Sequence, residues 1–115
     1  MSVIAKLKMA TQLHQAGSLP AAAAVYAEIL HHFPEHPDAL HLSGLVAHQQ
    51  GNVDQAVGLI EKAIHQRPTN AVYLKNLCAV LTASNRVDEA ATNYRTLVGI
   101  VPRDIDPWFG LGDKR

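Results

Sequence analysis

The sequence predicts an all-α fold, a solenoid of three helix-turn-helix units followed by the start of a fourth. Residues that end helices recur every 34 positions, so that Gly51 matches Gly17 and Asn85. Between these positions apolar residues recur at the spacing of one helix face. The central unit has more of them than one helix pair can bury, which requires cover from neighbouring units; they are Leu40, Val46, Ala47, Val53, Ala56, Val57, Ile60, Ala63 and Ile64.

Each unit is expected to contain two helices joined by a short turn. The pattern predicts the six helices Val3–Ala16, Leu19–His32, Pro37–Gln50, Val53–Gln66, Ala71–Ser84 and Val87–Ile100. A proline follows each second helix and ends it, because the residue before proline is pushed out of the helical region; these prolines are Pro34, Pro68 and Pro102.

The turn inside each unit has residues suited to a sharp change of direction. Gly17, Gly51 and Asn85 are types that accept the left-handed backbone found where a helix ends. Ser18 and Asn52 follow the two glycines, and their side chains are expected to accept hydrogen bonds from free N–H groups of the second helices.

Small residues occupy equivalent positions in the helices of each unit. They predict close approach of the paired helices, since a larger side chain would force them apart. In the first helices they are Ala10, Gly44 and Cys78, and in the second helices Ala22, Ala56 and Ala90.

This period and pattern resemble the tetratricopeptide repeat (TPR), whose signature is W-x2-L-G-x2-Y, then A-x3-F, then P. The signature positions of the central unit hold Leu40, Ser43, Gly44, Ala47, Ala56, Ile60 and Pro68. Those of the next unit hold Leu74, Leu77, Cys78, Leu81, Ala90, Tyr94 and Pro102. Those of the first unit hold Lys6, Met9, Ala10, Leu13, Ala22, Tyr26 and Pro34, of which only Lys6 departs from the apolar expectation. Near the C-terminus the W-x2-L-G part is matched in full by Trp108, Leu111 and Gly112.

The resemblance implies one TPR domain over residues 1–115, a right-handed superhelix with repeats at about 3–36, 37–70 and 71–104 and a partial fourth repeat at 105–115. Trp108 is expected to pack against the second helix of the third repeat, near Tyr94, Leu97 and Val98. An exposed apolar end of a solenoid can bind a second copy of the chain. Self-association through the C-terminal end is therefore a further hypothesis about this chain.

Composition excludes several classes of function. Ten basic residues balance ten acidic ones, so the chain lacks the excess positive charge with which proteins bind nucleic acid. Charged and polar residues interrupt the N-terminal apolar stretch, and no run approaches a membrane span, so neither a signal peptide nor a membrane anchor is expected. A single cysteine excludes an internal disulfide. A cytoplasmic location is therefore expected.

Neither catalysis nor a cofactor is expected from the side chains present. The chain has seven histidines, and the segment HHFPEH places His31, His32, Glu35 and His36 near a helix end. No helix has histidines at i and i+4, so surface histidines are favoured over a metal site. Cys78 lies at a small buried position and is interpreted as a packed thiol rather than a nucleophile. No triad, phosphate-binding loop or paired-carboxylate motif occurs.

In the TPR family the inner face of the first helices lines a concave groove that holds extended peptides or helices. The equivalent residues here are Leu7, Thr11, His14, Gln15, His41, Leu42, Leu45, His48, Gln49, Lys75, Asn76, Ala79 and Thr82. The chain is therefore interpreted as a non-catalytic module that binds a protein or peptide. Protonation of His14, His41 and His48 is expected to add up to about three positive charges to this groove between about pH 7.5 and 5.5.

One TPR subtype binds the C-terminal carboxylate of heat-shock chaperones through a clamp of Lys, Asn, Asn, Lys and Arg. The clamp positions here hold Leu7, Thr11, Leu42, Val72 and Asn76, so a chaperone tail is not the expected partner. The unfinished fourth repeat motivates another hypothesis. In this hypothesis the chain is the N-terminal TPR segment of a larger protein that has a glycosyltransferase-, sulfotransferase- or methyltransferase-like domain.

Overall fold

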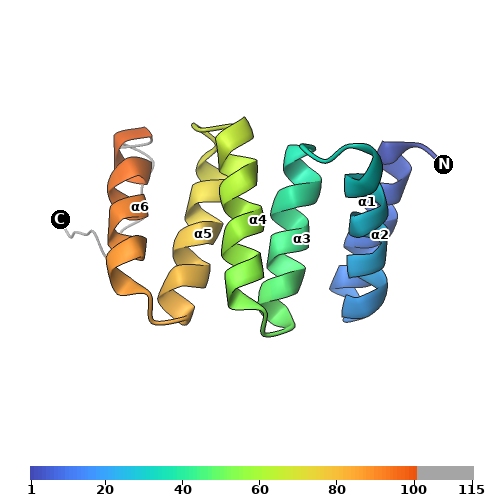
Figure 1. Ribbon diagram of the computed structural model, residues 1–115, viewed down its shortest axis with the longest axis horizontal. Helices are drawn as coiled ribbons and strands as arrows, with labels where there is room; N and C mark the ends of the chain where they lie inside the picture. The colour runs from blue at the N-terminus through green and yellow to red at the C-terminus, as the bar shows by residue number, and fades with distance from the viewer. Residues whose placement is uncertain (101–115) are drawn as a thin grey trace.

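The computed structural model describes residues 1–100 of the 115-residue chain. The described residues form helices and no strand, in the order α1 (Val3–Gln15), α2 (Leu19–His32), α3 (Pro37–Gln49), α4 (Val53–Gln66), α5 (Ala71–Ala83) and α6 (Val87–Ile100). The helices follow one another along the long axis of a body measuring 48 × 25 × 22 Å (Figure 1). The predicted all-α solenoid is confirmed, and each first helix ends one residue before its predicted end.

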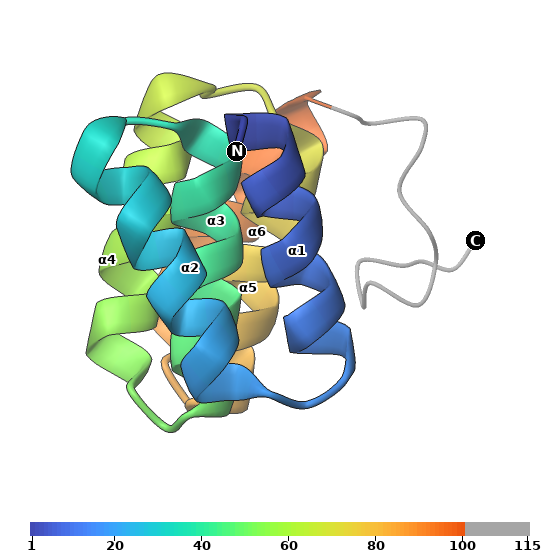
Figure 2. The same ribbon diagram turned by 90° about the vertical axis from the view of Figure 1, so that its right-hand side faces the viewer.

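The helices are arranged in two layers. Each first helix packs against the second helix of its own pair, and that second helix packs against the first helix of the next pair. A view along the stack shows α2 and α4 on one side and α1 and α5 on the other (Figure 2). None of the described helices has the length and apolar character needed to cross a membrane.

A polar side chain caps the N-terminus of each first helix. The side chains of Ser2, His36 and Asn70 accept hydrogen bonds from the backbone N–H three residues later, at 3.1, 3.2 and 2.9 Å. These caps lie one period apart, so the repeat extends to the residue that begins each first helix. Capping satisfies an N–H group that has no partner within the helix.

The predicted left-handed turns are confirmed, with φ of 84° at Gly17, 87° at Gly51 and 61° at Asn85. The predicted caps at Ser18 and Asn52 are wrong, because neither side chain accepts a hydrogen bond from the following helix. Their backbone N–H groups instead bond back to the preceding helix, Ser18 to the carbonyl of Leu13 at 2.9 Å. This bond closes a Schellman turn, and the backbone that it imposes, with ψ of 68° at Ser18, differs from the extended form of a side-chain cap.

The predicted small positions lie where paired helices meet. Ala10, Ala22, Ala56, Ala90 and Cys78 are all buried. A Cβ atom added to Gly44 of α3 would lie 2.7 Å from Cγ1 of Ile60 and 3.1 Å from the carbonyl oxygen of Ala56, both in α4. The α3–α4 contact therefore requires glycine at this position.

The core consists of three clusters that bridge the repeats. One joins buried residues of α1, α2 and α3, among them Tyr26 and Val46. The second joins α3 to α6 through residues that include Ile60 and Leu77, and the third joins α3, α4 and α5 through Leu40, Ala63 and Tyr73. Each repeat is thus covered by its neighbour, as the apolar positions predict. The predicted fourth repeat at 105–115, with Trp108, lies outside the described residues.

Candidate functional site

The thirteen predicted groove residues all lie on the first helices, and we call them the first-helix face. Five of them are exposed: Gln15, Gln49, Lys75, Ala79 and Thr82. Seven are partly buried: Leu7, Thr11, His14, Leu42, Leu45, His48 and Asn76. One, His41, is buried. The set therefore combines accessible side chains with others that hold neighbouring helices together.

Between α1 and α3 the first-helix face is linked by both polar and apolar contacts. His14 Nε2–H donates a hydrogen bond to the side-chain oxygen of Gln49. Leu7 and Leu42 pack against the same buried cluster, which includes Ala10 and Val46. These polar and apolar contacts hold α1 beside α3.

Between α3 and α5 two hydrogen bonds join residues on successive first helices. The Tyr73 hydroxyl donates to the carboxylate of Asp38 at 2.5 Å, and the amide of Asn76 donates to Nε2 of His41 at 2.8 Å. The His41 and Tyr73 rings also pack together, with their centroids 4.6 Å apart. Together these contacts form a polar link at the centre of the stack, which we call the α3–α5 link.

The structure corrects the role predicted for His41. Its side chain is only 5% exposed, so it does not present an imidazole to a partner. Burial lowers the pKa of His41, while the nearby Asp38 carboxylate acts in the opposite direction. The prediction that His41 adds a third positive charge to the groove is therefore wrong, because the charged form of a buried imidazole is poorly solvated. Its burial depends on α5, which sequence spacing within α3 does not reveal.

Three further exposed residues lie on the first helices but are not among the thirteen predicted groove residues, although one of them, Val72, is named above as a clamp position. Ile4 and Val72 lie one period to either side of Asp38, near the N-terminal ends of α1 and α5, and are 79% and 58% exposed. Lys8 lies one period before Leu42 and is also exposed. The period itself was the signal that could have identified them.

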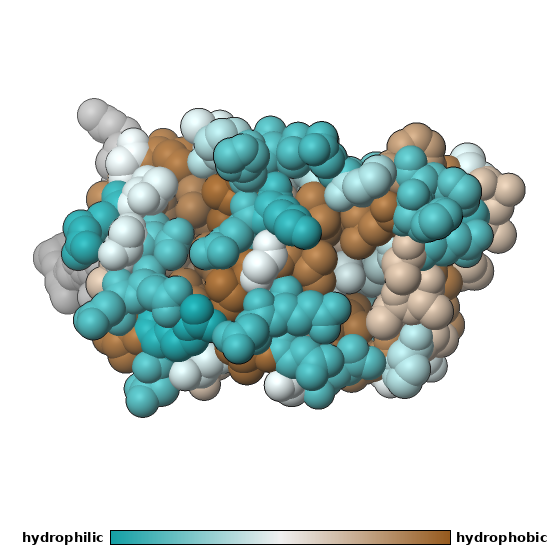
Figure 3. All heavy atoms as spheres, viewed as in Figure 1, coloured by the Kyte–Doolittle hydropathy of each residue, from teal (hydrophilic) through white to brown (hydrophobic). Residues whose placement is uncertain are grey.

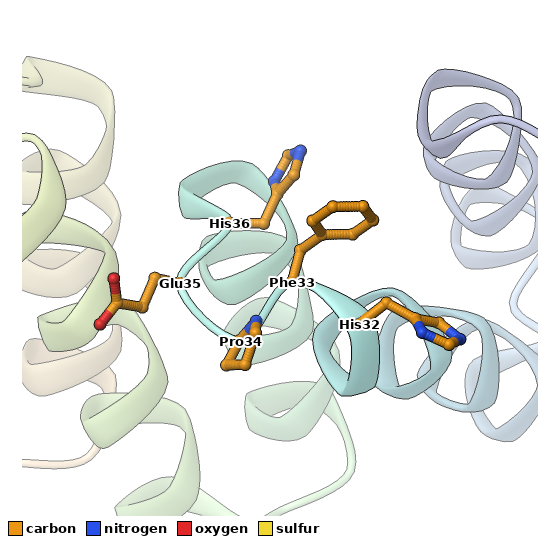
Figure 4. A pocket seen from close by; sticks show the side chains of 5 residues that line it. All are labelled: His32, Phe33, Pro34, Glu35 and His36. Carbon is orange, nitrogen blue, oxygen red and sulfur yellow. The ribbon is translucent and has the colours of Figure 1, made fainter.

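A second surface feature lies in the loop between the first two repeats. A pocket of about 440 Å³ is lined by His32, Phe33, Pro34, Glu35 and His36. Phe33 is 49% exposed, and its ring points to the same side as His36 while Glu35 points away (Figure 4). His36 is already used as the cap of α3. Among residues 1–100 no cluster of three metal-ligating side chains occurs.

The second helices present a different surface. Figure 3 shows that the side bearing α2 and α4 is covered by many hydrophilic side chains, with hydrophobic ones visible between them. Charged residues exposed there include Glu28 of α2 and both Glu61 and Lys62 of α4. Cys78, by contrast, is inaccessible, and burial raises the pKa of its thiol to about 11. It is therefore protonated at neutral pH and unsuited to nucleophilic attack.

Comparison with solved structures finds the same fold in longer proteins. A mutant of the Thermobaculum terrenum O-GlcNAc transferase is 30% identical, with a TM-score of 0.78 over 87% of this chain and 19% of that one. MamA from Desulfovibrio magneticus RS-1 is 16% identical, with a TM-score of 0.82 over 90% of this chain and 58% of that one. MamA MSR-1 is 22% identical, with a TM-score of 0.75 over 89% of this chain and 59% of that one.

The chain thus spans less than two thirds of each of these proteins. A search of curated protein sequences finds no match. Two family models, both described as tetratricopeptide repeat, match residues 7–71 and residues 47–111. Together with the helix pairs, their left-handed turns and the packing between repeats, these matches establish that the chain belongs to the tetratricopeptide repeat family.

Proposed function

We propose that this chain is a non-catalytic protein-interaction module whose first-helix face binds a peptide or helix of a partner protein. The observation that carries this proposal is the exposure, full or partial, of unlike side chains along successive first helices. Lys75, Ala79 and Thr82 are exposed along α5. Leu42, Leu45 and His48 are partly exposed along α3. A face that offers apolar, hydroxyl, imidazole and cationic groups on neighbouring helices is suited to an extended or helical segment.

The contacts between first helices support the same proposal. The His14–Gln49 hydrogen bond and the α3–α5 link hold three helices beside one another before any partner arrives. A surface ordered in advance loses less conformational entropy on binding, which favours affinity. Catalysis finds no comparable support, because the thiol of Cys78 is buried and protonated.

Selection of a peptide from a random 12-residue display library, followed by NMR titration, tests the proposal. We expect the selected peptide to shift backbone resonances of α1, α3 and α5. Leu45→Asp should weaken binding, because it places an uncompensated charge in a partly buried apolar position. The matched control, Lys62→Asp on the exposed face of α4, should bind like the wild type.

Two results would contradict the proposal. If the shifted resonances belonged to α2 and α4, the partner would bind the other layer of the solenoid. If Leu45→Asp bound as tightly as the wild type while remaining folded by circular dichroism, the first-helix face would not be the binding surface.

The alternative, a TPR segment of a larger catalytic protein, is compatible with the same face. The observation that bears on it is the 30% identity to an O-GlcNAc transferase, of which this chain spans 19%. That likeness does not favour the alternative over a binding module, because the matched segment is only part of the transferase. Reading the gene beyond the codon for Arg115 tests it, and a stop codon there would rule it out.

A further inference from the structure

An apolar strip crosses the three first helices. Leu42 and Leu45 are partly exposed, one turn apart on α3. Leu7 of α1 packs against the same buried cluster as Leu42 and is also partly exposed. Ala79 of α5 is exposed one period after Leu45, so it continues the strip in the third repeat. We call these four residues, Leu7, Leu42, Leu45 and Ala79, the apolar band.

Polar side chains on the α1 side of the apolar band already have partners within the chain. The Thr11 hydroxyl donates to the carbonyl of Leu7 at 2.9 Å and lies 3.4 Å from the hydroxyl of Tyr26. The His14 ring and the Gln49 side chain are joined by the hydrogen bond between α1 and α3. These bonds exist before a partner binds, so the groups are not offered to a peptide backbone.

The same holds on the α5 side of the apolar band. There the α3–α5 link engages a carboxylate, an imidazole and an amide. Lys75 also has an interaction partner. His48 and Lys8 lie beside the apolar band and take no part in the hydrogen bonds described above; His48 is partly exposed and Lys8 is exposed. Lys8 occupies in α1 the repeat position of Leu42, so a cation lies at the α1 end of an uncharged surface.

Such a surface discriminates between the two shapes that a partner segment can take. An extended peptide has backbone N–H and C=O groups without partners, and those that faced the apolar band would lose water without gaining a hydrogen bond. A helix bonds its own backbone groups internally and can present a purely apolar stripe at positions i, i+3, i+4 and i+7. The surface therefore favours a helix.

We infer that the partner segment is an amphipathic helix whose apolar stripe lies on the apolar band, with a carboxylate beside the stripe that pairs with Lys8. This inference rests on the proposed function and narrows its ligand class from any peptide to a helix. A charge placed against Leu42 or Leu45 would lose water without meeting an opposite charge, so the stripe itself is uncharged. A 16-residue helix is about 24 Å long, which spans three first helices with axes about 8–10 Å apart.

Selection from a random 16-residue peptide library on the wild-type chain, followed by NMR of the bound peptide, tests the inference. We expect binders with apolar residues at i, i+3 or i+4 and i+7, and with the carbon chemical shifts of a helix when bound. Proline placed mid-peptide, outside the apolar stripe, should weaken binding roughly 100-fold, because it breaks a helix interior. Alanine at the same peptide position is the control and should bind like the parent peptide.

A variant of the chain tests the surface that the peptide contacts. Leu42→Ala should weaken binding about 5- to 30-fold, because it removes part of the apolar area that the stripe covers. The matched control is Leu59→Ala, the same substitution at a partly buried position of α4, and it should bind like the wild type. Circular dichroism checks that both variants are folded, and the proline test needs no variant of the chain.

The charge at the α1 end is tested separately. Lys8→Gln should weaken the selected peptides about 1.5- to 5-fold, the range for one exposed ion pair. This difference from the wild type should shrink at about 0.5 M salt, because exposed pairs are screened. An unchanged affinity at low salt would overturn the carboxylate placed beside Lys8.

The results separate this inference from the proposed function. A bound peptide with extended chemical shifts, or a proline peptide that binds as tightly as its alanine control, would overturn the helix while leaving the binding module intact. Equal affinities of Leu42→Ala and Leu59→Ala would overturn the apolar band as the contact surface. A selection that yields no binder, or binders that shift only α2 and α4, would overturn the proposed function as well.

Discussion

Tyr73 is the residue through which the second and third repeats are joined most directly. Its hydroxyl bonds to Asp38, its ring packs on His41, and its side chain is only 2% exposed. Burial and the neighbouring carboxylate raise its pKa to about 12. The hydroxyl therefore remains a hydrogen-bond donor throughout the neutral range.

We predict that Tyr73→Phe destabilises the fold by about 1.5–3 kcal/mol, because hydrogen bonds to charged groups contribute that much. The matched control is Tyr26→Phe, whose hydroxyl lies 3.4 Å from the hydroxyl of Thr11, a longer contact with a neutral group. This control should cost about 0.5–1.5 kcal/mol. Urea denaturation measures both, and equal losses would contradict the role given to the Asp38–Tyr73 bond.

The buried imidazole of His41 makes the stability of the fold depend on pH in the acidic range. Its pKa is lowered in the folded chain, so between about 6.5 and that lowered value the unfolded chain binds more protons. The stabilising effect of neutral His41 is thus fully present above about pH 6.5 and is lost as the pH falls below it. Protonation would also place a donor on Nε2, which now accepts from Asn76.

We predict that His41→Gln flattens this dependence, because glutamine retains an acceptor for Asn76 and does not titrate. Thermal denaturation at pH 7.5, 6.5, 5.5 and 4.5 should show a smaller loss of stability toward acid in the variant than in the wild type. His65→Gln, which alters an exposed residue of α4, is the control and should leave the slope unchanged. Parallel pH curves for the wild type and His41→Gln would refute the assignment.

At the scale of elements, two glycines in adjacent helices have opposite surroundings. Gly44 in α3 faces Ile60 and the backbone of α4, whereas a Cβ atom added to Gly58 in α4 would meet nothing within 4 Å. Both are interior helix positions, where alanine is intrinsically favoured over glycine by about 1 kcal/mol. Their substitution therefore separates helix propensity from helix packing.

We predict that Gly44→Ala destabilises the chain, since overpacking costs about 1–3 kcal/mol and outweighs the gain in helix propensity. Gly58→Ala should stabilise it by about 0.5–1 kcal/mol. Urea midpoints of the two variants should therefore move in opposite directions. Stabilisation by both substitutions would mean that α3 and α4 do not approach as closely as described.

At the scale of the whole molecule, α6 is the last helix of the part of the chain that the structure describes. A pocket of about 350 Å³ there is lined by Ala91, Tyr94, Arg95 and Val98. Two of these residues, Tyr94 and Val98, belong to the surface against which the sequence predicts Trp108 to pack. Trp108 itself lies outside the described residues, so this contact stays a prediction.

We predict that Trp108→Ala lowers stability by about 3–5 kcal/mol, the usual cost of deleting a buried tryptophan side chain. Trp108 is the single tryptophan of the chain, so its fluorescence reports its surroundings without ambiguity. Emission typical of exposed indole, together with an unchanged melting temperature, would place the end of the domain near Pro102. Sedimentation at several concentrations would then show whether the apolar end of the stack self-associates.

The sequence by itself determined the features that depend on neighbouring residues along the chain. Left-handed turns at Gly17, Gly51 and Asn85 follow from backbone sterics that any short peptide would share. Helix boundaries are also local, because prolines and turn residues act on their immediate neighbours in the chain. The 34-residue period then predicts how many helix pairs the chain forms. Three equivalent caps at the starts of the first helices were missed, although Ser2 and Asn70 are common capping types.

Only the tertiary structure decided which members of the first-helix face are accessible. His41 and His48 lie two turns apart on one helix, yet His41 is buried and His48 is partly exposed. The difference comes from Tyr73 and Asn76 of α5, each 35 residues from its partner in α3. Helix spacing places a side chain on a face, but its burial depends on the chain that packs over that face, and that chain belongs to the next repeat.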